Sequence, residues 1–408
     1  MKRAVSDLAC LGGQPAFQRP LHVGYPNVGD RQRFLRRVED ILDRRWLTND
    51  GKFVREFEQA IAAMAGVEHC VATCNGTVAL ELALRACGIK GEVIVPAFTF
   101  AATAHAAQWQ GMTPVFADIE PVGHHIDAAA VESLITPDTT GIVGVHLWGR
   151  PCDIEALTTV ASSHGLRLIF DAAPALGCSW RGRMIGGFGD CEVLSFHATK
   201  VLNTLEGGAV LTNDAELADT IRLMRNFGFS GYDEVSCVGT NAKMNEVSAA
   251  MGLTLLEQFD SIVAANEAAY RLYVDRLEAV PGIRFVEYER SERNNFHYVV
   301  LEIDEGESGI SRDLLLFVLH GENVLARRYF YPGCHRMEPY KSLQRYAGLS
   351  LPVTEGVANR VLVLPTGPSL RASDIDLVAE IIRTSIENSE VICQRLEAEP
   401  NPWTTQLA

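Results

Sequence analysis

The stretch Asp190-Cys-Glu-Val-Leu-Ser-Phe-His-Ala-Thr-Lys200 decides how the rest of the chain is interpreted. Its β-branched and apolar run from Val193 to Phe196 predicts a buried strand, and the chain then enters an irregular segment that leads to Gly207-Gly208. One lysine therefore stands where a strand ends, among small and hydroxylated residues. In most proteins such a lysine is a solvated loop charge, because lysine is rarely buried without a partner. The alternative is a lysine that acts as a nucleophile.

The length and composition indicate a globular protein with two domains. The chain has 408 residues, whereas a single hydrophobic core stops growing at about 250 to 300 residues. Hydrophobic residues make up 47% of the sequence and charged residues 21%, and no repeat or low-complexity tract interrupts it. Room for a large core is therefore not a constraint.

The net charge argues against general binding to nucleic acids. Lysine and arginine number 36 against 51 aspartates and glutamates, and the basic residues are dispersed except for short pairs. Nucleic-acid affinity needs a concentrated positive face, and an anionic substrate would need a local basic pocket. The start lacks the apolar core of a secretory signal, and no apolar run reaches the roughly 20 residues that span a bilayer. We therefore expect a cytoplasmic protein without membrane contact.

Ten cysteines are scattered along the sequence without a metal-binding pattern. No CxxC pair and no cysteine or histidine ligand spacing occurs, so we predict no zinc or other metal site. Reduced thiols that fill the core are the better interpretation.

The first two thirds of the chain predict an α/β fold. Residues 1–30 show no periodicity and are expected to form an extended N-terminal arm, and helices are expected at 31–45 and 52–64. Short apolar runs then alternate with helical segments, which predicts strands at 71–74, 92–96, 113–118, 141–147 and 166–171 and helices at 75–86, 100–110, 127–134 and 153–164. Such alternation is typical of a mostly parallel sheet with helices on both faces, which binds ligands at the carboxyl ends of its strands.

The pattern changes in the last third of the chain. After a strand at 209–212 and a helix at 214–226, a long helix starts near Glu246 and runs to Leu256 or as far as Leu277. Strands at 283–287, 298–303 and 361–364 and helices at 313–320 and 373–387 then predict a smaller α+β domain. The expected division is an N-terminal arm at 1–30, a large domain at 31–260, a small C-terminal domain at 261–390 and a loose tail at 391–408.

Polar residues stand at the predicted strand ends. Asn75-Gly76-Thr77 begins a helix, so its unpaired N–H groups and the Thr77 hydroxyl could receive a phosphate, although an ordinary N-cap would look the same. Phe100 follows the next strand and either lies flat against an aromatic cofactor or fills the core. A phosphate site together with a residue that can stack on an aromatic ring would form a cofactor site.

Asp171 is the sharper signal, because it ends the apolar run Leu168-Ile-Phe170. A buried carboxylate is costly unless it is paired with a positive charge, and a protonated pyridine nitrogen is such a partner. An N-cap of the next segment is the alternative interpretation. Our hypothesis is that Lys200 carries pyridoxal phosphate as a Schiff base, with Asp171 at the ring nitrogen.

With these residues assembled, the chain resembles the DegT/StrS-type sugar aminotransferases from about residue 20 to residue 385. The family motifs occur in family order, as Asn75-Gly-Thr77, Pro96-x-Phe-Thr-Phe100, Asp171-Ala-Ala173, Ser195-Phe-His-Ala-Thr-Lys200, Glu206-Gly-Gly208 and Gly239-Thr-Asn-Ala-Lys-Met244. The resemblance implies the aspartate-aminotransferase fold of pyridoxal phosphate enzymes, fold type I. That fold has a large domain with a mostly parallel seven-stranded sheet flanked by helices, and a smaller C-terminal α+β domain.

The resemblance also implies a role for each matching position. Lys200 would be the catalytic lysine, Asp171 would pair with the pyridine nitrogen, and Phe100 would stack on the ring. Three residues would hold the phosphate, namely Gly76, Thr77 and Ser195. Asn241 would reach the phosphate of the neighbouring subunit, which implies a homodimer with composite active sites.

The activity implied by the resemblance is transamination of a nucleotide-linked keto sugar with L-glutamate as the amino donor, in amino-sugar biosynthesis. The turn at 46–51 and the segments 226–229 and 334–340 are most similar to members that act at C4 of a dTDP-4-keto-6-deoxyhexose. The expected substrate-binding residues are Thr48, Asn49, His197, Arg327, Tyr331, His335 and Tyr340. For Arg327 and Arg328, a basic solvated turn is as good an interpretation as a diphosphate site.

Other functions stay open on the sequence. Pro174 stands where the family often has Gln or His, so one side-chain contact is lost or supplied elsewhere. A C3-ketosugar or cyclitol (scyllo-inosose) aminotransferase is the main alternative, since Leu11-Gly-Gly-Gln-Pro15 resembles the cyclitol branch. A sugar dehydratase is disfavoured because those relatives have histidine at the position of Lys200. A non-catalytic sensor is disfavoured because no cofactor-binding residue is lost.

Overall fold

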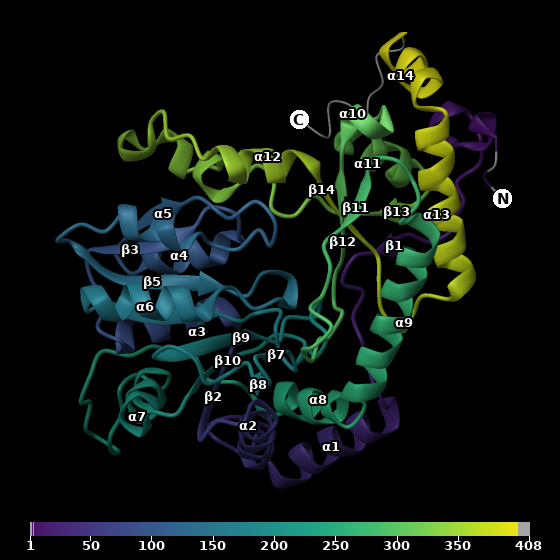
Figure 1. The fold of residues 1–408 in the computed structure, drawn as a ribbon. Coiled ribbons are helices and arrows are strands. Elements are labelled where there is room, and N and C mark those ends of the chain that lie inside the picture. Colours follow the sequence, from purple (N-terminus) through teal and green to yellow (C-terminus); the bar gives the residue numbers. More distant parts are fainter. Residues whose placement is uncertain (1, 3, 399–408) are drawn as a thin grey trace.

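A seven-stranded sheet forms the centre of the large domain in the computed structural model, which describes residue 2 and residues 4–398 (Figure 1). The strand order is β2-β10-β9-β6-β5-β3-β4. Only β10 runs antiparallel to its neighbours. The strands are β2 (His69–Thr73), β3 (Glu92–Pro96), β4 (Thr113–Ala117), β5 (Thr139–Val145), β6 (Arg167–Asp171), β9 (Cys191–Ser195) and β10 (Gly208–Thr212). The predicted mostly parallel, seven-stranded sheet is confirmed.

The register of the strands brings the predicted site residues to one edge of the sheet. Asp171 pairs with Val145 on one side and Val193 on the other. Ser195 pairs with Gly208, the first residue of β10. Because parallel strands end at the same edge, the segments that follow them form one surface.

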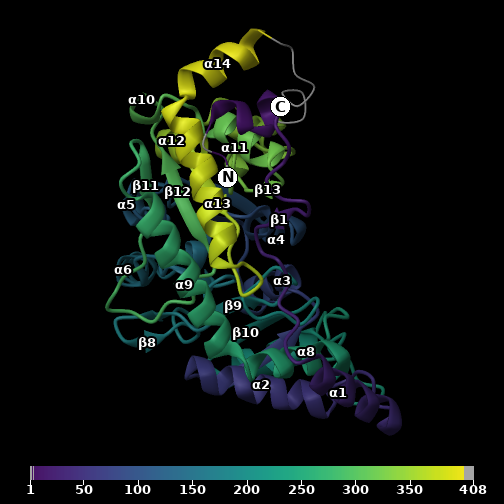
Figure 2. The same ribbon diagram turned by 90° about the vertical axis from the view of Figure 1, so that its right-hand side faces the viewer.

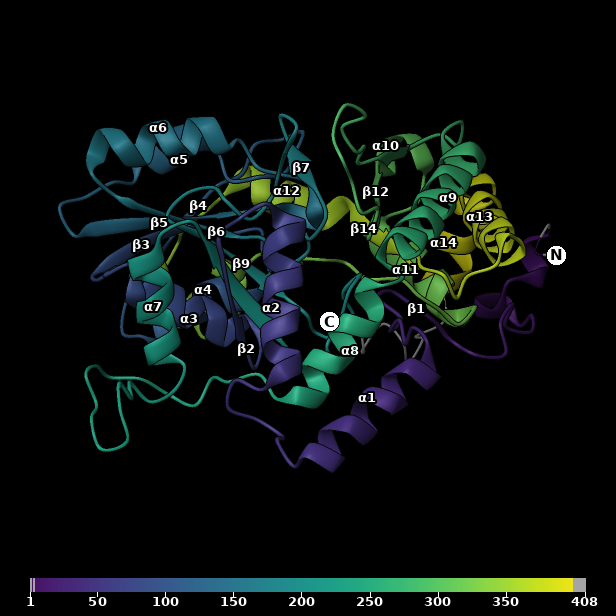
Figure 3. The same cartoon turned by 90° about the horizontal axis from the view of Figure 1, so that it is seen from below.

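Helices cover both faces of this sheet. One face carries α3 (Gly76–Ala86), α4 (Ala101–Trp109) and α7 (Ala215–Met224). The other face carries α2 (Lys52–Ala65), α5 (Ala128–Ser133), α6 (Ile154–His164) and α8 (Glu246–Leu256). Strand residues alternate between the two cores, so that Leu194 faces one and Val193 the other. Seen from below, α1 (Arg31–Arg44) and α2 lie against α8 (Figure 3).

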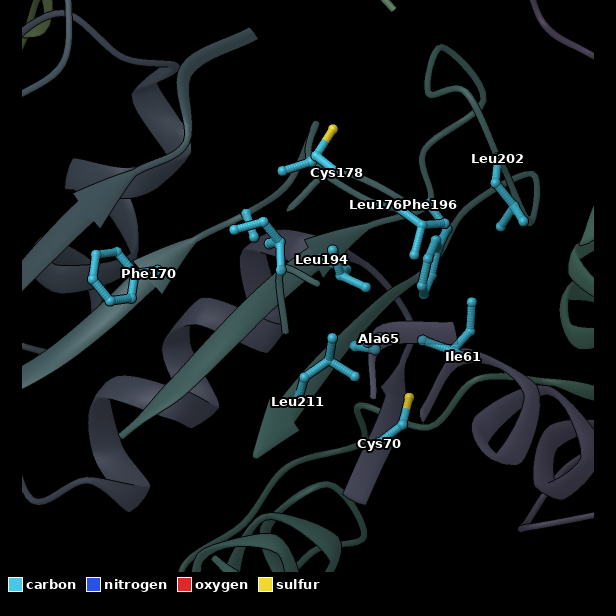
Figure 4. Close-up of a cluster of buried hydrophobic side chains, with 14 of the residues drawn as sticks. Ile61, Ala65, Cys70, Phe170, Leu176, Cys178, Leu194, Phe196, Leu202 and Leu211 are labelled. Atoms are coloured by element: carbon cyan, nitrogen blue, oxygen red, sulfur yellow. The ribbon is translucent and has the colours of Figure 1, made fainter. Parts of the chain in front are cut away.

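The core beneath the Lys200 segment is packed with side chains from several elements. Leu194 and Leu211 come from β9 and β10, Ile61 from α2, and Phe196 and Leu202 from the two ends of the segment that contains Lys200 (Figure 4). Phe196 is fully buried and meets Phe57 edge-on, with ring centroids 5.1 Å apart. Apolar anchors on both sides of Lys200 therefore fix the path of this irregular segment.

The small domain is built on a second, antiparallel sheet. Its order is β11-β12-β14, with β11 at Ile283–Phe285, β12 at Val299–Ile303 and β14 at Val361–Leu364. Helix α13 (Ala372–Glu387) packs against α9 (Phe259–Leu277) and α11 (Arg312–Gly321) to form its core (Figure 2). A shorter helix, α10, spans Glu305–Ser308.

The helix expected from Glu246 to Leu256, or as far as Leu277, ends at Leu256, and a second helix follows it. Helix α8 ends at Leu256, and Gln258 has non-helical backbone angles before α9 starts at Phe259. The start of α9 packs in the large-domain core through Phe259 and Ile262, and its end packs in the small-domain core through Tyr273 and Leu277. The break redirects the chain from one core to the other, so an unbroken helix to Leu277 is wrong.

The N-terminal arm is folded onto the small domain instead of being extended throughout. Two short 3-10 turns, Val5–Asp7 and Ala9–Leu11, place Leu8 in the small-domain core. A buried ion pair joins Lys2 to Glu322 at 2.9 Å. Strand β1 (Leu21–His22) then pairs in parallel with β13 (Val324–Leu325). These contacts join residues about 300 positions apart, which local sequence patterns do not reveal.

Some elements have no counterpart in the sequence prediction. They are the hairpin of β7 (Ser179–Trp180) and β8 (Arg183–Met184), helix α12 (Pro352–Arg360), and the 3-10 turns between residues 334 and 346. Helix α14 (Ser389–Ala398) occupies the first part of the expected loose tail, and residues 399–408 lie outside the described residues. No described helix has the length and apolar character needed to cross a membrane.

Candidate active site

A cavity of about 280 Å³ lies where the parallel strands of the large sheet end. Seven of the predicted site residues line it: Gly76, Thr77, Phe100, Asp171, Ser195, His197 and Lys200. Residues that the sequence prediction missed complete the wall, above all Trp148 after β5 and Tyr298, Tyr329 and Phe330 from the small domain. Both domains therefore contribute to one site.

Lys200 lies in a turn whose main chain is fixed on both sides. Its N–H donates to the carbonyl of His197 at 2.8 Å, and the Asn27 side chain donates to the next carbonyl, that of Val201, at 3.0 Å. The side chain is half-buried in the cavity. Burial lowers the pKa of Lys200 from its ordinary value of 10.5, although Asp171 and Tyr329 oppose this shift. The fold therefore favours the neutral amine, which is the nucleophilic form.

Asp171 is held by few hydrogen bonds for a buried carboxylate. It is 5% exposed, and it accepts hydrogen bonds from the Thr103 hydroxyl at 2.8 Å and from the Ala173 N–H at 3.1 Å. Thr103 is in turn 3.0 Å from the Thr99 hydroxyl. Burial raises the pKa of Asp171 above its ordinary 3.8, against the lowering effects of Thr103, Ala173 and Lys200. In the part of the chain that the structure describes, no cation forms an ion pair with this carboxylate, which is therefore suited to receive one.

The start of α3 forms a close-fitting cradle against β9 and β10. Asn75 caps the helix by accepting from the N–H of Val78 at 2.9 Å, and the N–H groups before it have no partner within the helix. A Cβ on Gly76 would lie 3.0 Å from the Cβ of Ser195, and a Cβ on Gly208 would lie 2.6 Å from the nitrogen of Gly76. A side chain at position 208 would therefore clash with the backbone, and one at position 76 would force Ser195 to move by a few tenths of an ångström. The Thr77 and Ser195 side chains complete a site suited to an anion.

Phe100 and His197 lie toward the open side of the cavity. Phe100 is the N-cap of α4 and is 62% exposed, with its ring centroid 6.5 Å from that of Phe330. His197 is exposed, with Nδ1 2.8 Å from the Thr199 hydroxyl and Nε2 3.6 Å from a Glu206 carboxylate oxygen. Both side chains are thus available to a ligand that enters the cavity.

Several predicted residues lie outside the cavity of the single chain. Thr48, Asn49 and Asn241 are exposed, and Asn241 bridges to the backbone of Asn226. Arg327 is exposed and holds its guanidinium 5.2 Å from the ring centroid of Tyr329. The structure therefore does not bring these residues to the Lys200 cavity within one chain.

The segment around Tyr331, His335 and Tyr340 extends from the small domain over the large one (Figure 1). Tyr331 is partly exposed, whereas Tyr340 is buried edge-on against Phe116, at 5.0 Å between ring centroids. His335 is buried, with Nε2 3.1 Å from Glu355. His335 and Tyr340 thus pack beneath this segment instead of lining the cavity.

The side chains that sequence reasoning missed carried weak signals or none. Thr99 and Thr103 stand four residues apart at a helix start, a spacing that places two hydroxyls on one face and could have indicated support for Asp171. Nothing near Tyr298 or Tyr329 in the sequence indicates a site. Pro174 lines the cavity, and its carbonyl accepts from the Asn295 side chain at 2.8 Å. That bond fixes the turn after Asp171 but supplies no contact inside the cavity.

The arrangement fits pyridoxal phosphate. This cofactor presents an aldehyde, a ring nitrogen that can carry a proton, and a phosphate. The cavity offers the Lys200 amine, the Asp171 carboxylate and the N–H and hydroxyl groups at the start of α3. Asp171 gains the cation that it lacks, and the glycine cradle has the chemistry for the phosphate.

Comparison with known proteins gives one consistent family. The pattern of the DegT/DnrJ/EryC1/StrS aminotransferase family matches residues 29–383. A dTDP-4-amino-4,6-dideoxy-D-glucose transaminase of Shigella dysenteriae is 35% identical over 367 residues, which cover 90% of this chain and 99% of that protein. A UDP-N-acetyl-3-dehydro-alpha-D-glucosamine 3-aminotransferase of Acidithiobacillus ferrooxidans is 34% identical over 367 residues, which cover 87% of this chain and 94% of the other.

A solved structure is similar over almost the whole fold. The structure of DesI in the presence of its TDP-sugar product is 49% identical in sequence, with a TM-score of 0.92. The match covers 96% of this chain and 99% of that one. Both domains therefore share their fold with this structure.

Proposed function

The chain belongs to the DegT/DnrJ/EryC1/StrS aminotransferase family, and from this premise we propose that it aminates C4 of a dTDP-4-keto-6-deoxyhexose with L-glutamate as the donor. The product would serve amino-sugar biosynthesis, for a natural product or a surface glycan. The family depends on pyridoxal 5′-phosphate. The observation that carries the C4 assignment is the 49% identity to DesI, solved with its TDP-sugar product, together with the near full-length match to a dTDP-4-amino-4,6-dideoxy-D-glucose transaminase.

Lys200 is the proposed catalytic residue. When bound, the cofactor supplies an electron sink for the carbon that gains or loses the amino group. The lowered pKa of Lys200 favours the neutral amine, whose Nζ can take a proton from the carbon that loses the amino group and give one to the carbon that gains it. The main-chain bonds around Lys200 hold the side chain at the strand end while it does so.

The other cavity residues are proposed to bind and orient. Gly76, Thr77 and Ser195 hold the phosphate, Asp171 keeps the ring nitrogen protonated, and Phe100 covers the ring. An anchored phosphate keeps the ring in place each time the lysine leaves or returns. Because strand ends and a helix start fix these side chains, they need little rearrangement during the reaction.

A homodimer with composite active sites is part of the proposal. Exposed apolar side chains include Leu205 and four residues of one loop, Phe227, Phe229, Val235 and Val238; Phe229 pairs with Val235, and the rings of Phe227 and Phe229 have centroids 6.2 Å apart. Scattered apolar residues are normal, but a contiguous group marks an interface. Asn241 follows these segments and cannot serve its own cavity, so we assign it to the phosphate of the partner's site.

The sugar nucleotide is proposed to enter from the open side of the cavity. His197, Thr48 and Asn49 are exposed polar residues available for the sugar, and Arg327 and Tyr331 are exposed near the small-domain wall for the diphosphate. His335 and Tyr340 shape the segment above them through their buried contacts. We propose the domain limits as 31–260 and 261–390, with the arm at 1–30 attached to the small domain.

The test is turnover by the purified holoenzyme with L-glutamate and dTDP-4-keto-6-deoxyglucose. We expect the dTDP-4-amino sugar and 2-oxoglutarate in equal amounts, and none from Lys200→Ala. Protein that binds pyridoxal phosphate but forms no amino sugar would exclude the C4 assignment.

Amination at C3 or of a cyclitol is the second candidate. It is favoured by the 3-aminotransferase that is 34% identical over most of the chain. The same assay with a C3-keto nucleotide sugar and with scyllo-inosose distinguishes the candidates, because the true acceptor should be used with the highest kcat/KM.

A further inference from the structure

Tyr329 brings a phenol from the small domain into the cavity that holds Lys200. We propose that Tyr329 is a positioning residue for Lys200, whose Nζ reaches the Tyr329 hydroxyl by rotation of the lysine stem when the amine is not covalently engaged. The proposal rests on the proposed function, because it assigns Tyr329 to the same reaction. It adds a role for the small domain, which would fix the lysine and not only close the cavity.

The small-domain sheet fixes the position of Tyr329. Two residues earlier, Arg327 exchanges both main-chain hydrogen bonds with Val363 of β14, at 2.9 and 2.7 Å. The Tyr329 ring stacks on Phe330, with centroids 5.2 Å apart, and meets Tyr298 edge-on at 6.4 Å. The Arg327 guanidinium lies 5.2 Å from the same ring. The phenol is therefore a fixed part of the wall.

Lys200 needs such a partner. Among the described residues, its Nζ makes no hydrogen bond or ion pair, although its main chain is fixed. The flexible four-carbon stem allows many positions of Nζ, and a hydrogen bond to a fixed group would select one of them. Asp171 already accepts from Thr103 and Ala173 and is assigned to the ring nitrogen.

Tyr329 and Lys200 influence each other electrostatically. Burial raises the pKa of Tyr329 above 10, with a contribution from Tyr298, while Arg327 and Lys200 lower it. Tyr329 in turn raises the pKa of Lys200. A phenol with this pKa is neutral at physiological pH, so its oxygen can accept from the ammonium form of Lys200 and its O–H can donate to the amine form.

The other groups that face Lys200 cannot take this role. Burial and the charge of Lys200 lower the pKa of His297 to about 3. Its Nε2 is buried without a partner, and His297 does not line the cavity. Tyr298 lines the cavity, but burial alone raises its pKa to about 12, without an effect of Lys200. Tyr298 is thus a matched control for Tyr329.

The first test measures the lysine in cofactor-free protein. The chain has only six lysines, and Lys52, Lys90 and Lys341 are exposed and serve as internal references. Acetylation with trace acetic anhydride over a pH series, read by peptide mass spectrometry, gives the pKa of each lysine. A charge-assisted hydrogen bond from the ammonium to the phenol stabilises the charged form, so Tyr329→Phe should lower the pKa of Lys200 by about 0.5 to 1 unit. Tyr298→Phe should leave it unchanged.

The second test separates positioning from substrate binding. In the holoenzyme, Tyr329→Phe should lower kcat by about 10- to 100-fold and leave KM for both substrates within about twofold. A raised KM with unchanged kcat, or a Lys200 pKa equal to wild type, would overturn the proposal. The acetylation uses neither substrate nor cofactor, so its failure with normal wild-type turnover contradicts only the role of Tyr329. Absence of wild-type amino transfer would instead contradict the proposed function.

Discussion

At the scale of single residues, Asp171 carries a buried charge that is unfavourable until a ligand with a positive charge binds beside it. Its pKa in the folded protein is raised above the ordinary 3.8. At pH values between 3.8 and this raised pKa, the folded chain therefore binds more protons than the unfolded chain. Stability contributed by this group is therefore lost as pH rises through that window. At neutral pH the ionised carboxylate destabilises the cofactor-free protein until a cation binds beside it.

Replacing Asp171 by asparagine should therefore stabilise the cofactor-free protein. The amide oxygen can accept from the Ala173 N–H, and the NH2 group can donate to the Thr103 hydroxyl, without the buried charge. We expect the free energy of unfolding in urea to rise by about 1 kcal/mol at pH 7, and the affinity for pyridoxal phosphate to fall at least about tenfold. The gain should shrink as the pH falls through the raised pKa of Asp171, because the wild-type carboxyl is then protonated and uncharged.

Asp118→Asn provides the control with the opposite sign. Asp118 is only half-buried and accepts four hydrogen bonds, from the N–H groups of Ile119, Val353 and Thr354 and from the Thr354 hydroxyl. Replacing one of its acceptor oxygens by an NH2 group should cost about 1 kcal/mol of stability. If both variants destabilise the cofactor-free protein equally, Asp171 is an ordinary structural carboxylate.

At the scale of elements, the start of α3 shows how closely a helix must approach a strand to form the anion site. Gly76 allows the first turn to approach Ser195, and Asn75 caps the helix without closing the site. The sequence allowed either a phosphate site or an ordinary N-cap at Asn75-Gly76-Thr77. The two are compatible, because Asn75 caps the helix while its neighbours face the cavity.

A methyl group at Gly76 should separate cofactor binding from folding. In Gly76→Ala the new Cβ meets Ser195 at 3.0 Å, so we expect the affinity for pyridoxal phosphate to fall about tenfold in equilibrium dialysis. Gly88→Ala, just beyond the other end of α3, adds the same methyl group in open space at a φ of +73°. It should lower stability by about 1 kcal/mol and leave the affinity unchanged. Equal affinities in the two variants would contradict the cradle.

Most elements could be predicted from sequence because their apolar periods are clear. Strand β3, for example, occupies the expected residues 92–96. The sequence left open whether the helix from Glu246 ends at Leu256 or continues, since Glu257 and Gln258 are both good helix formers and only packing into two different cores requires the turn. The folded N-terminal arm depends on the distant Lys2–Glu322 pair, which has no local signature.

At the scale of the whole molecule, one cavity draws on two domains, and the proposed site draws on two subunits. The motif residues of the large domain could be found from sequence because each follows a strand. Tyr298, Tyr329 and Phe330 could not, because the small domain brings them to the site only through tertiary packing. Asn241 has a motif, but its place outside the single-chain cavity gives it a role only in the proposed dimer.

Mixing two inactive variants should restore activity if the sites are composite. Lys200→Ala lacks the catalytic amine, and Asn241→Asp places a negative charge against the partner's phosphate. Mixed dimers contain one site with both wild-type residues, so an equal mixture reassembled after mild denaturation should reach about a quarter of wild-type activity. Light scattering should give a dimer for each variant. No recovery from confirmed mixed dimers would place Asn241 and Lys200 in the same subunit's site.

The central claim, amino transfer from glutamate to a C4 ketone, is tested most directly by the visible absorption of the holoenzyme in two half-reactions. L-Glutamate should bleach the visible band, and after its removal dTDP-4-keto-6-deoxyglucose should restore the band with one equivalent of amino sugar per site. A C3-keto nucleotide sugar and scyllo-inosose should restore it far more slowly. Recovery by either of these and not by the C4 ketone would contradict the account.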